Sequence, residues 1–167
     1  QVKHAGQYVD IIWSAPGFAD GTERPSGSGI PILFPFPGRI QGTVFHWQGK
    51  DYSLPAGDGQ GNAIHGFVHE RPWRVIEREP DRLVGQFQAS LDDPQLLENW
   101  PTDFVITADY RVQKDQLSCS YRVQNPSATP LPYGLGTHPY FALPLGGTSV
   151  DACRLQLPVA ERWELVE

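Results

Sequence analysis

The sequence contains little of what marks several common protein classes. Methionine is absent, and only two cysteines, Cys119 and Cys153, occur among 167 residues. Two cysteines do not make the disulfide framework of a small secreted domain, which favours a reducing, cytoplasmic location. Without methionine, Gln1 is not an intact translational start unless the initiator was removed, and we expect a trimmed N-terminus.

Long apolar runs and basic clusters are missing as well. No stretch approaches the roughly 20 consecutive apolar residues of a membrane-spanning helix, and we expect a soluble protein with no membrane partner. Lysine and arginine number 13 against 19 aspartate and glutamate, a net charge of −6. No basic segment carries the interleaved aromatic residues that suit nucleic acid. We therefore expect no nucleic-acid partner.

Turn-forming residues are abundant by contrast. The 16 prolines and 17 glycines are spread along the chain, and the apolar residues between them are largely β-branched or aromatic. This composition is typical of short strands joined by turns, and the length suits one domain. We expect an all-β fold, an antiparallel β-sandwich, with residues 1–167 forming a single domain.

Alternating apolar and polar residues predict individual strands. The clearest runs from Phe104 to Val112, and a second, from Leu117 to Val123, follows after a short turn, so the two form an antiparallel hairpin. One short helical segment is expected at Asp92–Glu98, with an acidic cap and an early proline. Further strands are expected at Tyr8–Trp13, Val44–Trp47, Asp51–Leu54, Trp73–Arg78, Leu83–Ala89 and Arg154–Leu157.

Two histidines stand in stiff, Gly-rich frames. His138 precedes Pro139 in GTHPYF at 136–141, and a residue before proline is held in extended geometry. His65 occupies GNAIHGF at 61–67. An imidazole exchanges a proton near neutral pH, so the pair suggests a polar small-molecule pocket with an acid or base. Each residue alone is equally compatible with a hydrogen-bonded structural histidine.

Arg39 ends a proline-stiffened loop, PFPGR at 35–39, where its guanidinium could donate a planar fork of hydrogen bonds to vicinal hydroxyls. The alternative is a solvated surface arginine. His65 and His69 have the spacing of a helical zinc pair, but the surrounding glycine and proline argue against a helix. In a strand the two would stand about 13 Å apart, so we expect no metal site and a surface position for His69. Neither a calcium loop, a dinucleotide fingerprint nor a serine nucleophile elbow is matched.

Three segments together resemble the aldose 1-epimerase (galactose mutarotase) family. They are IPILFPFPGRI at 30–40, GNAIHGF at 61–67 followed by RPW at 71–73, and GTHPYF at 136–141. The resemblance implies a galactose mutarotase-like β-sandwich and an isomerase that interconverts the α and β anomers of a hexose such as galactose or glucose. It also implies that the reaction needs no cofactor.

The family mechanism assigns roles to residues of this chain. A carboxylate base takes the proton of the C1 hydroxyl while an imidazolium protonates the ring oxygen, and the opened ring recloses on the other face. By motif, His138 matches the general acid and His65 the sugar-binding histidine that assists it. Arg39 matches the arginine that binds sugar hydroxyls. Asn62 and Tyr140 match supports of the pocket.

The chain departs from the family pattern in two ways. Gly38 stands where many members have asparagine, which leaves the choice of sugar open. The catalytic glutamate and a sugar-binding aspartate belong to a C-terminal portion whose motif is not matched by Glu161, Glu164 or Glu167. We therefore expect a domain truncated at both ends, with little mutarotation from the 167 residues alone.

Three alternatives remain open on the sequence. A hexose-6-phosphate 1-epimerase would need further cationic side chains at the cleft. A non-catalytic carbohydrate-binding β-sandwich would keep the pocket without the carboxylate. A purely structural domain would bind no sugar at all.

Overall fold

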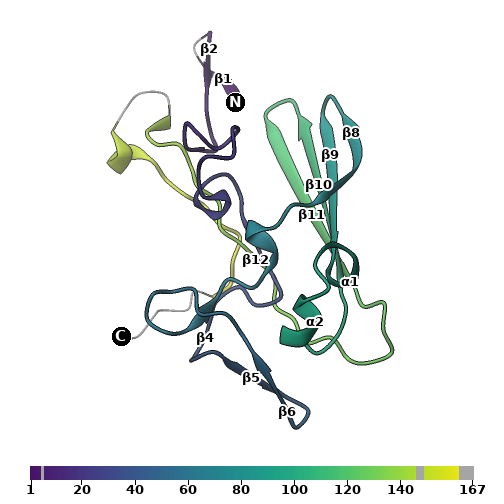
Figure 1. Cartoon of the computed structure of the whole chain (residues 1–167). Coiled ribbons are helices and arrows are strands. Elements are labelled where there is room, and N and C mark those ends of the chain that lie inside the picture. Colours follow the sequence, from purple (N-terminus) through teal and green to yellow (C-terminus); the bar gives the residue numbers. More distant parts are fainter. Residues whose placement is uncertain (5, 146–148, 162–167) are drawn as a thin grey trace.

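The longest strands form one four-stranded antiparallel sheet. In the computed structural model, which describes residues 1–4, 6–145 and 149–161, its order is β11-β10-β9-β8 (Figure 1). The predicted hairpin is confirmed, with Val105 opposite Gln124 and Gln113 opposite Gln116. The strands are β8 (Arg74–Glu79), β9 (Arg82–Gln88), β10 (Val105–Gln113) and β11 (Gln116–Gln124).

Short strand pairs make up the rest of the β-structure, and all of them are antiparallel. The β5–β6 hairpin projects from one end of the molecule and β1–β2 lies at the other (Figure 1). The pairs are β1 (Val2–His4) with β2 (Gln7–Val9), β3 (Ile32–Leu33) with β12 (Gly136–Thr137), β4 (Arg39–Ile40) with β7 (Ala63–Ile64), and β5 (Val44–Trp47) with β6 (Lys50–Ser53).

Helices are short, and none in the described part of the chain has the length and apolar character needed to cross a membrane. They are the α-helices α1 (Ala89–Asp92) and α2 (Leu96–Asn99), and the 3₁₀ turns η1 (Pro25–Gly27), η2 (Val68–Glu70) and η4 (Val150–Ala152). The segment expected to be helical at Asp92–Glu98 is therefore helical only at Asp92, where α1 ends, and at 96–98 in α2. Pro94 lacks the N–H that would continue the first helix.

Two strand predictions were wrong in whole or in part. Residues 154–157 form no strand, because alternation yields a strand only where a partner pairs with it; Leu155 and Leu157 are largely exposed. The strand expected over 8–13 stops at Val9, and Ile12 makes only an isolated bridge to Phe141. The other predicted strands lie within about one residue of their expected bounds.

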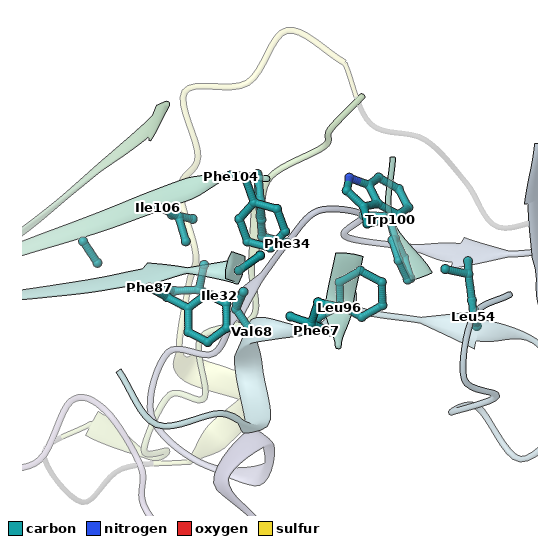
Figure 2. Close-up of a cluster of buried hydrophobic side chains, with 14 residues drawn as sticks. Ile32, Phe34, Leu54, Phe67, Val68, Phe87, Leu96, Trp100, Phe104 and Ile106 are labelled. Carbon is teal, nitrogen blue, oxygen red and sulfur yellow. The ribbon is translucent and has the colours of Figure 1, made fainter. Parts of the chain in front are cut away.

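An aromatic core joins the long sheet to the shorter pieces (Figure 2). Phe34 meets Phe104 of the sheet edge-on, with ring centroids 4.9 Å apart. Trp100 stacks on Phe45 at 4.6 Å and donates its indole N–H to the Pro132 carbonyl oxygen. Buried aromatic pairs of this kind add to the hydrophobic stabilisation of the fold. The predicted antiparallel all-β class is confirmed, and the core holds the Phe34 segment beneath the site described next.

Candidate functional site

His138 is placed by the pairing of β12 with β3. Thr137 lies opposite Ile32, and the His138 amide donates to the Pro31 carbonyl oxygen at 3.0 Å. The Tyr140 amide donates to the Gly29 carbonyl oxygen at 2.9 Å, so the two chain segments stay in register beyond the strands. The segment that carries His138 is therefore anchored on residues 29–33.

His65 is placed by a turn at the end of β7. His65 and Gly66 both have positive φ angles, +66° and +71°, and this reverses the chain so that Gly66 bridges Phe34. A left-handed conformation costs a non-glycine residue about 1–2 kcal/mol, so His65 is held there by its surroundings. One contribution is the hydrogen bond that the His65 amide donates to the Gly38 carbonyl oxygen. At Gly66 a Cβ would lie 2.0 Å from the Phe34 carbonyl oxygen, so only glycine fits.

The two turns bring the predicted histidines together. The ring centroids of His65 and His138 are 6.0 Å apart, and the Tyr140 ring lies 5.0 Å from that of His138. All three line one cavity of about 150 Å³. Sites for drug-sized ligands span about 300–1,000 Å³, so this cavity suits a smaller polar molecule. The remaining lining residues are Arg24, Ser26, Gly27, Pro31 and Leu33.

Arg39 and Asn62 do not line that cavity and instead meet at Asp58. The Asp58 carboxylate, which is inaccessible to solvent, accepts from Arg39 Nε at 3.1 Å and from Asn62 Nδ2 at 2.8 Å. Asn62 Oδ1 in turn accepts from the Gly42 amide. Arg39 is on β4, which pairs with β7 directly before His65. The structure therefore places Arg39 next to the site with one edge of its guanidinium fixed.

The hydrogen bonds at Asp58 explain its charge state. The side chain and backbone of Asn62, the Gln60 amide and Arg39 together outweigh the opposing effect of burial and hold the pKa of Asp58 well below its ordinary value of 3.8. The sequence indicated Asp58 only as part of a rejected calcium loop. Its position at the centre of this network depends on the turn at 57–62, which no periodicity reveals.

The surroundings of His65 favour its neutral form. Burial, followed by the nearby charges of His138, Arg39 and Arg24, lowers the pKa of His65 below its ordinary value of 6.5. A neutral imidazole both donates and accepts one hydrogen bond, so His65 can bind a hydroxyl group in either sense.

His69 is not the surface residue that the sequence predicted. Its side chain is only 10% exposed, and its ring stands perpendicular to that of His65 with centroids 6.0 Å apart. The predicted 13 Å separation does not arise because the positive φ angles at 65–66 turn the chain into η2. Burial lowers the pKa of His69, although Glu70, 3.7 Å from Nε2, acts in the opposite direction. In the described part of the chain, no group of three or more His, Cys, Asp or Glu side chains could hold a metal ion.

Sequence reasoning missed one wall of the cavity. Glu70 Oε1 accepts from Arg24 Nε at 3.0 Å and from Ser26 Oγ at 2.9 Å. The Tyr140 hydroxyl donates to the Ser26 carbonyl oxygen at 3.3 Å. The only signal was a polar, proline-stiffened loop at 24–27, similar to the one that indicated Arg39. Glu70, which binds this loop, is distant from it in the sequence, so the contact could not be predicted from sequence patterns.

A larger hollow of about 570 Å³ lies between the N-terminal segment and the β10–β11 hairpin. Its lining is mainly apolar, with Ile11, Ile12 and Leu117 among its residues, and it contains none of the predicted site residues. The smaller cavity is the better candidate because converging polar and titratable groups, rather than size, distinguish a reactive site.

Comparisons with known proteins agree with the motifs. The sequence model of the aldose 1-epimerase family matches residues 1–167 of this chain. In Escherichia coli (strain K12), uncharacterized protein YihR is 30% identical over 139 residues, which cover 81% of this chain and 42% of that protein. Uncharacterized protein YphB from the same organism is 28% identical over 149 residues, which cover 85% of this chain and 48% of that protein.

Solved structures confirm the galactose mutarotase-like fold. The Slr1438 protein from Synechocystis sp. PCC 6803 has 30% identity and a TM-score of 0.62, over 78% of this chain and 43% of that one. A galactose mutarotase-like protein from Clostridium acetobutylicum has 26% identity and a TM-score of 0.71, over 85% of this chain and 44% of that one. The chain thus spans less than half the length of these relatives.

Proposed function

This chain belongs to the aldose 1-epimerase family, and we propose that its His65–His138 cavity is part of the sugar site of an aldose 1-epimerase. The substrate is a hexose such as galactose or glucose, and the reaction interconverts its α and β anomers. The proposal rests on one observation: the ring centroids of His65 and His138 are 6.0 Å apart, and the Tyr140 ring lies beside that of His138.

His138 is the proposed general acid. Its imidazolium gives a proton to the ring oxygen while a base removes the proton of the C1 hydroxyl, so the bond between C1 and the ring oxygen breaks and C1 becomes an aldehyde. Rotation about the C1–C2 bond and attack of the new hydroxyl on the other face of the aldehyde close the ring. That hydroxyl returns its proton to His138, and the base returns its proton to the aldehyde oxygen, which becomes the C1 hydroxyl of the other anomer. A positioned acid of this kind contributes about 10²- to 10⁴-fold to a rate.

His65 is the proposed sugar-binding partner of His138. Burial and the neighbouring cations disfavour a proton on His65, so His65 is suited to act as the neutral member of the pair. The neutral ring hydrogen-bonds a sugar hydroxyl. Arg39 adds donors: its Nε is fixed by Asp58, and its side chain remains 52% exposed, so its terminal nitrogens are accessible to sugar hydroxyls.

The base is assigned to a carboxylate that the described cavity lining does not supply. No aspartate or glutamate is among the described residues that line the cavity. These residues therefore account for binding and protonation, and we expect the 167-residue chain on its own to bind hexose with little mutarotation. The same observation favours the second candidate, a carbohydrate-binding domain without turnover. Cys119 and Cys153 are both free, which supports the proposed cytoplasmic location. The family match supports a role in carbohydrate metabolism.

Polarimetry on freshly dissolved α-glucose and α-galactose tests the proposal, using the protein in the length in which cells make it. We expect His138→Gln to lower the enzymatic rate by about 100-fold or more. His46→Gln is the matched control, since His46 lies on the β5–β6 hairpin with its side chain 73% exposed. An undiminished rate in His138→Gln would refute the assignment. Hexose binding by the wild type without faster mutarotation would establish the non-catalytic alternative.

A further inference from the structure

Arg24 is the one permanently charged side chain among the described residues that line the His65–His138 cavity. Its side chain is 69% exposed, so a ligand can reach it. The proposed function assigns the sugar hydroxyls to His65 and Arg39 and gives Arg24 no part, although Arg24 lines the cavity and Arg39 does not. A permanent cation at this place therefore calls for a separate explanation.

Arg24 is held in place from one edge. Its Nε donates to Glu70 Oε1 at 3.0 Å, and the same oxygen accepts from Ser26 Oγ. Ser26 is in turn tied through its carbonyl oxygen to the Tyr140 hydroxyl, beside His138. Glu70 does not line the cavity. The arrangement engages the inner edge of the guanidinium and leaves its two terminal nitrogens without a hydrogen-bond partner among the described residues.

Arg39 repeats this arrangement nearby. Its Nε is bound to the carboxylate of Asp58, which solvent does not reach. The charges of both Arg39 and Arg24 disfavour protonation of His65, which places both cations within electrostatic range of the cavity. Each counter-charge lies outside the cavity lining, on the Nε side of its arginine. Both arginines near the cavity are thus fixed at Nε, and their terminal guanidinium nitrogens remain available to a ligand.

We propose that Arg24, positioned by Glu70, recognises an anionic substituent of the sugar, so that the substrate is a hexose bearing a phosphate or carboxylate group. This rests on the proposed function, because it names the substrate class of the same site. The two terminal nitrogens of a guanidinium match two oxygens of such a group in a bidentate, charge-assisted pair. Hydrogen bonds to charged groups are stronger than those to neutral hydroxyls, which sets a preference of roughly tenfold or more.

Calorimetric titration with glucose, glucose 6-phosphate, glucuronate and inorganic phosphate tests the inference. We expect at least one of the two anionic sugars to bind the wild type roughly tenfold more tightly than glucose, with a preference that weakens as salt is added. The comparison between glucose 6-phosphate and glucuronate identifies the anionic group. In Arg24→Gln the ratio of anionic to neutral affinity falls toward one, and in Arg24→Lys it falls in part, because charge remains without the planar fork.

Arg78→Gln is the matched control, since Arg78 is an exposed arginine on β8 at the edge of the long sheet, and it should keep the wild-type ratio. Equal wild-type affinities for glucose and both anionic sugars would overturn this inference and leave the proposed function standing. Inorganic phosphate binding as tightly as glucose 6-phosphate would also overturn it, because the sugar would then contribute nothing. Binding of none of the sugars would refute the proposed function itself.

Discussion

The imidazole rings of His65 and His138 lie 6.0 Å apart because both histidine segments are attached to the same short stretch of chain, residues 32–34. Gly136 and Thr137 of β12 pair with Leu33 and Ile32, and Gly66 bridges Phe34. Phe34 is itself fully buried in the aromatic core (Figure 2). The spacing of the proposed acid and its partner therefore depends on the packing of Phe34.

The contact between Gly66 and Phe34 predicts a strong effect of one methyl group. In Gly66→Ala the added Cβ would lie 2.0 Å from the Phe34 carbonyl oxygen, so the backbone must shift. We expect a loss of roughly 3 kcal/mol or more in the free energy of unfolding, measured by urea denaturation, from strain and left-handed backbone together. Gly59→Ala is the control, because its φ angle is +73° with no atom within 4 Å of the Cβ. Its cost should stay near 1–2 kcal/mol. Equal losses in the two variants would show that the contact with the Phe34 carbonyl oxygen adds nothing to the cost of Gly66→Ala.

The Asp58 network predicts a distant effect on sugar binding. Asp58→Ala removes the acceptor that fixes Arg39 Nε and Asn62 Nδ2. Since Arg39 then loses its orientation, we expect hexose affinity to fall by roughly tenfold in a calorimetric titration. Asp51→Ala removes an exposed carboxylate that pairs with His46 on the β5–β6 hairpin and should leave the affinity unchanged. An unaltered affinity in Asp58→Ala would mean that Arg39 does not contact the sugar.

Two partly buried histidines, His65 and His69, predict a loss of stability in mild acid. Burial lowers the folded-state pKa of both His65 and His69 below 6.5, with Glu70 opposing and the charges of His65, Arg24 and Arg71 reinforcing the shift at His69. Below pH 6.5 the unfolded chain then binds more protons than the folded one, so the free energy of unfolding falls as pH falls, by at most about 1.4 kcal/mol per pH unit for each group.

Urea denaturation at pH 7.5 and pH 5.5 measures this dependence. The stability difference between the two pH values should be smaller in His69→Gln than in the wild type, because one of the two groups no longer titrates. His46→Gln should retain the wild-type difference, since His46 is exposed on its hairpin. A His69→Gln variant with an undiminished difference would contradict the assigned role of His69.

Sequence patterns predicted those features that depend on local chemistry. The alternation in β10 and β11 and the turn between them specify a hairpin with little help from the remaining chain. The pre-proline position of His138 and the glycine frame of His65 likewise indicated constrained histidines before any contact was known.

Features that depend on distant contacts were missed. The buried position of His69 follows from positive φ angles at His65 and Gly66, and a non-glycine residue rarely adopts that region. The wall formed by Arg24 and Ser26 depends on Glu70, which is remote in sequence. Residues 154–157 alternate like a strand, but pairing requires a neighbour that alternation does not reveal.

Histidine ring signals in an NMR titration with hexose test directly whether the sugar binds in the His65–His138 cavity. We expect the ring C–H resonances of His65 and His138 to shift together and to saturate with one dissociation constant, whereas those of His46 stay in place. Assignment follows from the His65→Gln, His138→Gln and His46→Gln variants. Sugar binding that moves neither His65 nor His138 would contradict the claim that their shared cavity is the sugar site.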